Sequence, residues 1–231
     1  MRINKLFSNL GICSRKETNR IIAENRVTVN GQICTPGQWV EVEDNILIDN
    51  KPLPVKDKIY IALNKPVGVT CTALEKVENN IISFINHSDY IFPVGRLDKA
   101  SQGLILMTND GDLSNKITKS ENGHEKEYIV TVDRPFDDSF IEQMSQGVEI
   151  SKDKIKTRPC IVTRISEDSF RIILTQGLNK QIRKMSKVLG YRVIYLKRIR
   201  ILNIKIDGID IGKWRDLNEE EILELKRLVD Y

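Results

Sequence analysis

Arg96 and Asp98 stand two residues apart, and together they could form a site with a reactive carboxylate. If the chain entering Asp98 is extended, side chains at i and i+2 point the same way, so the guanidinium and the carboxylate would share one site. The apolar run at 103–107 predicts a short buried strand behind them, and Asn-Asp-Gly at 109–111 predicts the turn that closes it. Most Arg–Asp pairs are structural, so the spacing alone leaves a reactive and a structural interpretation open.

The composition is that of an ordinary globular protein. The chain has 231 residues, of which 40% are hydrophobic and 29% charged, and no apolar run reaches membrane-spanning length. Its N-terminus mixes polar and apolar residues, unlike a signal peptide. The four cysteines lie far apart without a Cys-x-x-Cys pair, and there are only two histidines, which argues against a zinc site. We therefore predict a reduced, cytoplasmic protein that binds no metal and no membrane.

Positive charge is concentrated in two parts of the chain. Residues 1–31 hold six Lys and Arg against two Glu, a net charge of +4 that equals that of the whole chain. Residues 176–205 hold nine Lys and Arg and no Asp or Glu, with Lys180 and Lys184 as candidate RNA contacts. Segregated positive charge is typical of proteins that bind a phosphate backbone. Either block alone could also be a solvated helix face.

The first 55 residues have the pattern of a small α/β module. A first helix is predicted by the i, i+3, i+4, i+7 spacing of Ile3, Leu6, Phe7 and Leu10. Ser14 with Glu17 three residues later has the form of a capping box and predicts a second helix to about residue 25. Residues 26–29 alternate as a strand, and Asn-Gly at 30–31 is a hairpin signal. The charged, proline-containing stretch 49–58 is predicted as a linker.

This module resembles the S4 RNA-binding domain, including its segment VTVNGQ at 27–32. The resemblance implies that residues 1–55 form an RNA-binding domain and that residues 59–231 form a second, larger domain. It also implies that the helix face meeting RNA phosphates carries the basic residues Arg2, Lys5, Arg15, Lys16 and Arg20.

The larger domain is predicted to be an α+β fold with a mixed, mainly antiparallel sheet, because strand patterns outnumber helix patterns and hairpin spacing is common. Strands are expected near 59–63, 67–72, 103–107, 128–132, 160–163, 170–174, 191–196 and 199–206. Helices are expected near 80–85, 113–118, 136–146 and 180–189, with a last one capped by Asn218.

Four segments of the chain occur in the order found in a known family. They are LNKPVG at 63–68, GRLDKASQGLILMTNDGDL at 95–113, KEY at 126–128 and QIRKM at 181–185. Together they resemble the pseudouridine synthases of the RsuA/RluB/RluE/RluF group, which act on ribosomal RNA. The resemblance covers essentially the whole chain. HEKEY at 124–128 and GRLDKASQGL at 95–104 are similar to the branch of synthase F, which modifies 23S rRNA.

By position, the resemblance implies a role for each of five residues. Asp98 corresponds to the catalytic carboxylate, and Tyr128 to the tyrosine that stacks on the target uracil and takes part in proton transfer. Arg183 corresponds to the basic residue that pairs with this carboxylate, and Arg96 to the arginine that helps to hold the displaced RNA. Lys65 lies in a motif whose role is mainly architectural.

The expected reaction is the isomerisation of a specific uridine to pseudouridine, which needs no cofactor and no metal. The target nucleotide must leave its stack, and an aromatic ring such as that of Tyr128 offsets part of this cost. The partner is expected to be 23S rRNA and the protein a monomer. A 16S rRNA or tRNA uridine remains an alternative, as does, in a different class, a non-catalytic RNA-binding protein of ribosome assembly.

Overall fold

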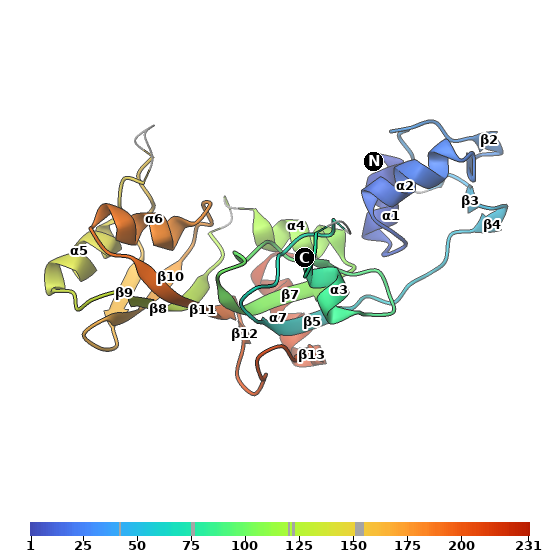
Figure 1. The fold of residues 1–231 in the computed structure, drawn as a ribbon. Coiled ribbons are helices and arrows are strands. Elements are labelled where there is room, and N and C mark those ends of the chain that lie inside the picture. Colours follow the sequence, from blue (N-terminus) through green and yellow to red (C-terminus); the bar gives the residue numbers. More distant parts are fainter. Residues whose placement is uncertain (42, 75–76, 120, 122, 151–154) are drawn as a thin grey trace.

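The chain folds around two sheets, a small one near the N-terminus and a large one in the rest of the protein (Figure 1). The computed structural model describes residues 1–41, 43–74, 77–119, 121, 123–150 and 155–231. No helix in these residues is long and apolar enough to cross a membrane.

The N-terminal module has two helices and four short strands. In chain order these are α1 (Ile3–Asn9), α2 (Arg15–Ala23), β1 (Val27–Val29), β2 (Gln32–Ile33), β3 (Ile46–Ile48) and β4 (Lys51–Pro52). Both expected helices are confirmed, and the Ser14 hydroxyl accepts a hydrogen bond from the Glu17 amide at 3.1 Å. Asn30 and Gly31 both have positive φ, as a tight hairpin turn between β1 and β2 requires.

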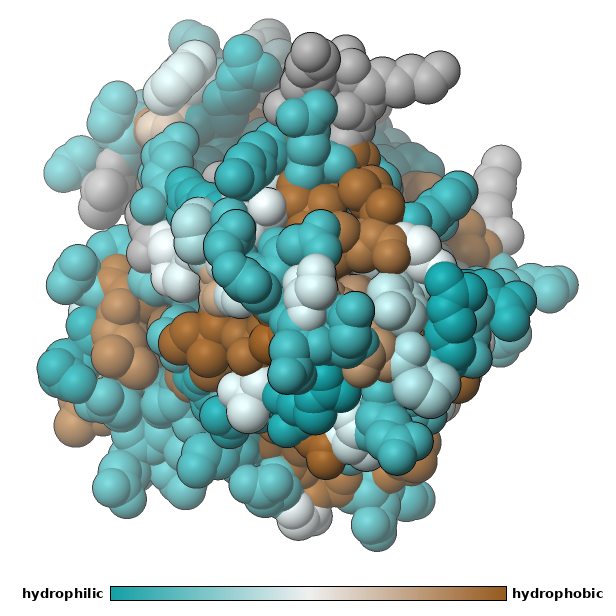
Figure 2. Space-filling model, turned by 90° about the vertical axis from the view of Figure 1, so that its left-hand side faces the viewer, coloured by the Kyte–Doolittle hydropathy of each residue, from teal (hydrophilic) through white to brown (hydrophobic). Residues whose placement is uncertain are grey.

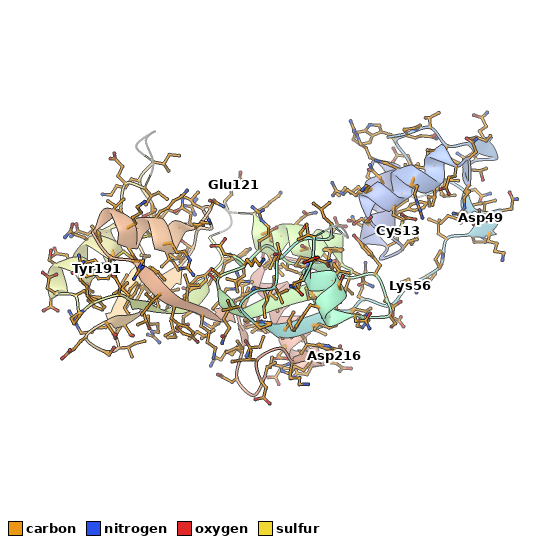
Figure 3. The ribbon with its side chains drawn as sticks, in the orientation of Figure 1. Cys13, Asp49, Lys56, Glu121, Tyr191 and Asp216 are labelled. Atoms are coloured by element: carbon orange, nitrogen blue, oxygen red, sulfur yellow. The ribbon has the colours of Figure 1, made fainter. Side chains whose placement is uncertain are left out.

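The predicted linker starts later than expected. Its first residues form a second tight turn, because Asp49 and Asn50 both have positive φ and the chain returns as β4 to pair with β3. The segment that follows joins the module to the rest of the protein, and Lys56 on it pairs with Asp89 at 2.7 Å (Figure 3).

The larger part contains a nine-stranded sheet with helices packed against it. The strands on its main path run in the order β13-β5-β7-β11-β8-β10-β9, with β6 paired to β7 and β12 to β11. The strands are β5 (Tyr60–Lys65), β6 (Phe92–Pro93), β7 (Gln102–Thr108), β8 (Lys126–Val132), β9 (Ile161–Arg164), β10 (Ser169–Leu174), β11 (Val193–Ile201), β12 (Ile204–Lys205) and β13 (Trp214–Asp216). The helices are α3 (Ile81–Ile85), α4 (Gly111–Thr118), α5 (Asp138–Gln146), α6 (Gln181–Val188) and α7 (Glu219–Leu228).

The α+β prediction with a mainly antiparallel sheet is confirmed, since every described strand pair is antiparallel except β7 with β11. That parallel pair joins the two halves of the sheet through Gln102 opposite Lys197 and Gly103 opposite Arg198. Gly103 has φ +115°, and a Cβ added there would lie 2.2 Å from the Arg198 carbonyl oxygen. Only glycine allows the two strands to approach this closely.

The centre of the sheet is buried on both faces. Along β5, Ile61 and Leu63 pack into one hydrophobic cluster with residues of α3, α5 and α6, whereas Tyr60 and Ala62 pack into another with residues of α4 and α7. This double burial explains why β5 and β7 are nearly continuous apolar runs. Away from this core, the end of the molecule near α5 and α6 has a mostly hydrophilic surface with separate hydrophobic patches (Figure 2).

Three of the expected strands differ in the structure. Residues 67–72 form a loop with one isolated bridge, from Thr70 to Asn80, because the backbone turns at Gly68, whose φ is +94°. The strands expected at 191–196 and 199–206 are instead one long strand, β11, which forms a hairpin with the short strand β12.

The N-terminal module contacts the larger part through α1 and α4. The Lys58 ammonium donates to the Asn9 carbonyl at 2.6 Å, and Lys5 pairs with Asp112 at 3.8 Å. Gly111 begins α4 beneath Asn9, and a Cβ there would lie 2.2 Å from the Asn9 side-chain oxygen. The start of the helix that follows the GRLD segment is therefore also the docking point of the module.

Candidate active site

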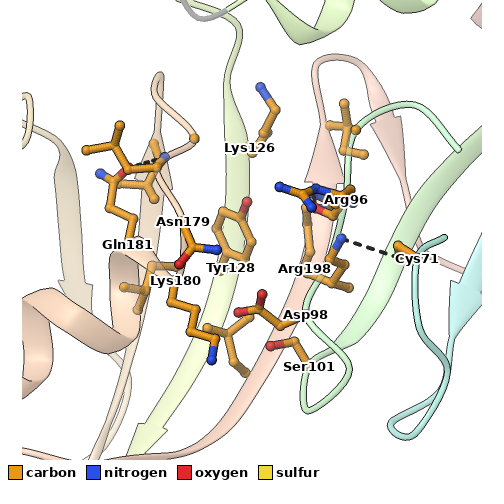
Figure 4. A pocket seen from close by; sticks show the side chains of 18 of the residues that line it. Cys71, Arg96, Asp98, Ser101, Lys126, Tyr128, Asn179, Lys180, Gln181 and Arg198 are labelled. Carbon is orange, nitrogen blue, oxygen red and sulfur yellow. Dashed lines mark hydrogen bonds between the residues drawn. The ribbon is translucent and has the colours of Figure 1, made fainter.

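A pocket of about 440 Å³ gathers residues from three of the four motif segments and from the loop that follows the fourth (Figure 4). The loop after LNKP contributes Thr70 and Cys71, the GRLD loop contributes Arg96 and Asp98, and the remaining two segments contribute residues of β8 and of the entry into α6. Segments that are far apart in the sequence therefore form a single site in space.

Asp98 lies in this pocket on a loop, and its side chain is half-buried. The loop is fixed through its backbone, since the Asp98 carbonyl accepts a hydrogen bond from the Ser101 amide at 2.9 Å. In the part of the chain that the structure describes, the Asp98 carboxylate has no hydrogen bond and no ion pair within 4.0 Å. In the view of Figure 4 it lies between the Tyr128 ring and Ser101. A carboxylate that has no partner and is carried by a fixed loop is well placed to react with a ligand.

Tyr128 forms a wall of the pocket from the middle of the sheet. Its side chain is 9% exposed and packs into the larger hydrophobic cluster. Its neighbours across β8 are Ile172 on β10 and Arg198 on β11. Residues opposite one another in a sheet share a face, so Arg198 also belongs to the pocket face. A buried ring at the edge of a pocket is a surface on which a flat base can stack.

The expected ion pair between Arg183 and Asp98 is absent from the described residues. Instead, the Arg183 guanidinium donates to the Val193 carbonyl at 3.0 Å, the Ala100 carbonyl at 3.0 Å and the Ser101 hydroxyl at 3.2 Å. These acceptors use both terminal nitrogens, Nη1 and Nη2, of the guanidinium group. Arg183 therefore binds the loop behind Asp98 and not the carboxylate itself. Its Nε is buried without a partner.

Lys65 is completely buried and organises the neighbouring loop. Its ammonium donates to the Pro66 carbonyl at 2.8 Å and the Val69 carbonyl at 2.9 Å, and burial lowers its pKa. The Gly68 amide then donates to the Lys99 carbonyl at 2.8 Å, which ties this loop to that of Asp98. This geometry supports the architectural role inferred from the sequence.

Three cations that line the pocket, Lys99, Lys126 and Arg198, were missed by the sequence reasoning, and the last two lie on strands of the sheet. Arg198 is 3% exposed; its Nε donates to the Leu104 carbonyl at 2.7 Å and its Nη1 to the Arg96 carbonyl at 3.5 Å. Its Nη2 is buried and has no partner in the described part of the chain. The Lys126 ammonium donates to the His124 carbonyl at 3.1 Å, and burial together with the nearby Arg198 charge lowers the pKa of Lys126 to about 8. Lys126 could have been identified from the alternation of side chains along the strand of Tyr128, which places both residues on the same face.

The residues predicted to bind RNA are divided between the pocket and the N-terminal module. Lys180 lines the pocket at the start of α6, Arg96 is exposed beside Asp98, and Lys184 is half-buried on α6. In the module, Arg2, Arg15, Lys16 and Arg20 are exposed and Lys5 is half-buried. Arg20 pairs with Glu17 and Glu24, and Lys5 with Asp112. No group of three or more metal-ligating side chains occurs among the described residues.

Comparison with known proteins identifies the family. Residues 59–187 match the family described as RNA pseudouridylate synthase, and residues 1–46 match the S4 domain. The chain belongs to the RNA pseudouridylate synthase family. It is therefore an RNA pseudouridine synthase, and the resemblance inferred from the four segments is confirmed.

Relatives match along the whole chain. The dual-specificity RNA pseudouridine synthase RluF of Escherichia coli is 46% identical over 100% of this chain and 80% of that protein. An uncharacterized RNA pseudouridine synthase of Aquifex aeolicus is 34% identical over 100% of this chain and 98% of that protein. A solved structure of a pseudouridylate synthase superposes with a TM-score of 0.71 at 27% identity, covering 97% of this chain and 99% of that one. These matches agree with the expected synthase F branch.

Proposed function

We propose that this synthase converts a uridine of 23S rRNA to pseudouridine in the pocket, with Asp98 as the catalytic carboxylate. The observation that carries the proposal is the Asp98 carboxylate itself, which faces the pocket beside Tyr128 without a partner among the described side chains. The 46% identity to RluF supports membership of the synthase F branch, and the resemblance to this branch suggests 23S rRNA as the substrate.

The reaction moves the bond between base and ribose without any net oxidation or reduction. The N1–C1′ bond of a flipped-out uridine breaks, the uracil turns, and a new bond forms between C5 and C1′. The hydrogen on C5 leaves as a proton and N1 gains one, so the product is an isomer of the substrate. Asp98 interacts with the reacting nucleotide, and Tyr128 stacks on the uracil and takes part in the proton transfer. Stacking offsets part of the few kcal/mol that unstacking the base costs.

The N-terminal module contributes RNA affinity in this proposal. Residues 1–55 contact RNA phosphates through the exposed basic side chains of α2, Arg15 and Lys16. In Figure 1 this module and α6 both rise on the same side of the large sheet, so one RNA could reach both. Arg96 and Lys180 line the pocket, Lys184 lies one turn further along α6, and these three would hold the displaced strand. We further propose that the protein acts as a monomer in the cytoplasm.

A second substrate is favoured by one finding. The RluF relatives are named as dual-specificity RNA synthases, and we propose tRNA as a second substrate of this chain. Because phosphate contacts position a protein without reading sequence, the same basic surfaces could serve both RNAs.

Mapping pseudouridines in total RNA from cells with and without this protein tests the proposal. We expect one 23S rRNA site to disappear with the protein, together with any tRNA site it serves. Restoring the wild-type protein should restore the modification, whereas restoring Asp98→Asn should not. A loss confined to 16S rRNA would contradict the 23S assignment.

A further inference from the structure

Of the cations that line the pocket, Lys126 and Arg198 are the two that lie on the sheet face of Tyr128. Neither has an ion pair within 4.0 Å among the residues that the structure describes. Arg198 is only 3% exposed, and its Nη2 has no acceptor among the residues described. A buried donor without an acceptor is costly, and two like charges beside each other add repulsion. Such a pair is suited to receive negative charge from a ligand.

The strand register places these two groups on the same face as the base-stacking ring. Arg198 on β11 lies directly opposite Tyr128 on β8, and Lys126 precedes Tyr128 by two residues. Side chains at i and i+2 of a strand share a face, and diagonal neighbours across two strands are within reach of long side chains. The cations therefore adjoin the surface on which the proposed uracil lies, and Arg198 also reaches the loop that carries Asp98 (Figure 4).

The reaction supplies negative charge at that place. When the N1–C1′ bond breaks, its electron pair stays with the uracil and spreads over N1, O2 and O4. When the C5–C1′ bond forms, the ring contributes an electron pair from C5, the C5 hydrogen leaves as a proton and N1 is protonated, so the charge disappears again. Cations held in place before the reaction stabilise charge that exists only during it.

We propose that Lys126 and Arg198 donate hydrogen bonds to the uracil oxygens and stabilise the negative charge that the ring carries while it is detached from the ribose. The inference rests on the proposed use of this pocket for the isomerisation. Burial of the Lys126 ammonium agrees with it, because a desolvated charge interacts more strongly with a neighbouring anion. Arg198 has a further task, since its bonds to Leu104 and Arg96 fix the loop of Asp98.

Lys126 is the better residue for a test, because within the described residues its ammonium donates to a single carbonyl and its loss should disturb the loop least. The substrate is a synthetic RNA spanning the uridine that the wild-type protein is found to modify, with either uridine or 5-fluorouridine at that position. Fluorine withdraws electrons and stabilises negative charge on the ring by itself, so it should reduce the need for the cations. Single-turnover loss of the starting nucleoside and RNA affinity are measured for each protein.

We expect Lys126→Met to lower the single-turnover rate on uridine about 100-fold and its RNA affinity less than about threefold. On 5-fluorouridine the loss should be below about tenfold, and Lys126→Arg should retain most of the rate. Lys197→Met is the matched control, because it removes a positive charge from β11 beside Arg198 but does not line the pocket. It should behave as the wild type.

Equal rate losses on the two RNAs, or a loss only of affinity, would overturn the proposal. Lys126→Gln provides a second neutral variant, and circular dichroism and thermal unfolding establish that each variant is folded. Because the RNA is whichever one the wild type modifies, a wrong 23S assignment does not affect the result. Asp98→Asn run in parallel shows separately whether Asp98 is required.

Discussion

Neighbouring residues hold the loop of Asp98 in place without forming hydrogen bonds or ion pairs with its carboxylate among the described residues. Its loop is tied down by the Ser101 amide, by Arg183 at Ala100 and by Arg198 at Arg96, all of which act on atoms other than the carboxylate. Every hydrogen-bonding position on the carboxylate is thus left for the nucleotide. A group arranged in this way combines fixed geometry with full reactivity.

Replacing Asp98 by Asn should abolish pseudouridine formation while RNA binding persists. The amide keeps the shape of the side chain but removes its negative charge, which the proposed chemistry requires. Pseudouridine in the RNA is measured by nucleoside mass spectrometry, and affinity by filter binding. Turnover comparable to that of the wild type would exclude Asp98 as the catalytic carboxylate.

The activity should fall as the pH rises through about 8, because that is the pKa to which burial and Arg198 lower Lys126. Below this pKa Lys126 is protonated and able to stabilise the uracil; above it, the neutral amine cannot. The charged group facing it is Arg198 from β11, with His124 on the preceding loop. Single-turnover rates over about pH 6 to 9.5 should show this decline in the wild type and not in Lys126→Met. A decline that persists unchanged in the variant belongs to another group.

At the level of elements, the contact between β7 and β11 determines the site, because Gly103 and Arg198 meet there. Any side chain at Gly103 would strike the Arg198 backbone and force apart the strands behind the GRLD loop. The glycine in the sequence SQGLIL is therefore explained by packing, although it lies only five residues from Asp98.

Gly103→Ala should lower the free energy of unfolding by about 2–4 kcal/mol, the sum of a clash and an unfavourable positive φ. Urea denaturation measures the change. Gly177→Ala is the control for stability, because a Cβ there meets nothing within 4 Å and its φ is not in the positive range. Its effect should be below about 0.5 kcal/mol. Similar stability of the two variants would show that the strands can separate without cost.

Arg183→Leu should reduce the rate of pseudouridine formation without shifting the pH dependence of that rate. Arg183 connects α6, the start of β11 and the loop at Ala100, so its loss frees the loop and removes the donor from the part-buried Val193 carbonyl. The pH–rate profile of the variant, scaled for its lower maximum, should superimpose on that of the wild type. A shift to higher pH would instead indicate that Arg183 pairs with Asp98 once RNA is bound.

The sequence predicts those parts of the fold that are determined by neighbouring residues in the chain. The cap at Ser14, the turn at Asn30 and the strand beyond Gly103 all follow from a few neighbouring residues. Residues 67–72 have the composition of a strand, but a buried lysine from the preceding strand, Lys65, holds them as a loop. Arg198 could not be identified either, because its role depends on a strand pairing between distant segments.

At the scale of the whole molecule, the N-terminal S4 module is proposed to add a second RNA-binding surface. Lys5 and Arg20 are already engaged by carboxylates, whereas no ion pair is found for Arg2, Arg15 or Lys16 within the residues described. The latter three should therefore contribute most of the counterion release when RNA binds.

A protein that begins at Lys58 should fold, because the large sheet has its own two hydrophobic clusters. It should bind RNA more weakly, and the slope of log affinity against log salt should become shallower by about 2 to 3 as the three free cations are lost. Filter binding at several salt concentrations measures this. An unchanged slope would mean that the module contacts the larger part but not RNA.

The pairing of β7 with β11 also dictates when the enzyme can become active during its synthesis. The hydrogen bond from Arg198 to Leu104 spans 94 residues, and that from Arg183 to Ser101 spans 82. The ribosome makes the loop of Asp98 long before the residues that fix it, and closing such a long stretch of chain is slow. A nascent chain can thus display the basic module, and engage RNA, well before it can modify a nucleotide. Catalytic competence therefore requires that the chain has emerged at least as far as Arg198.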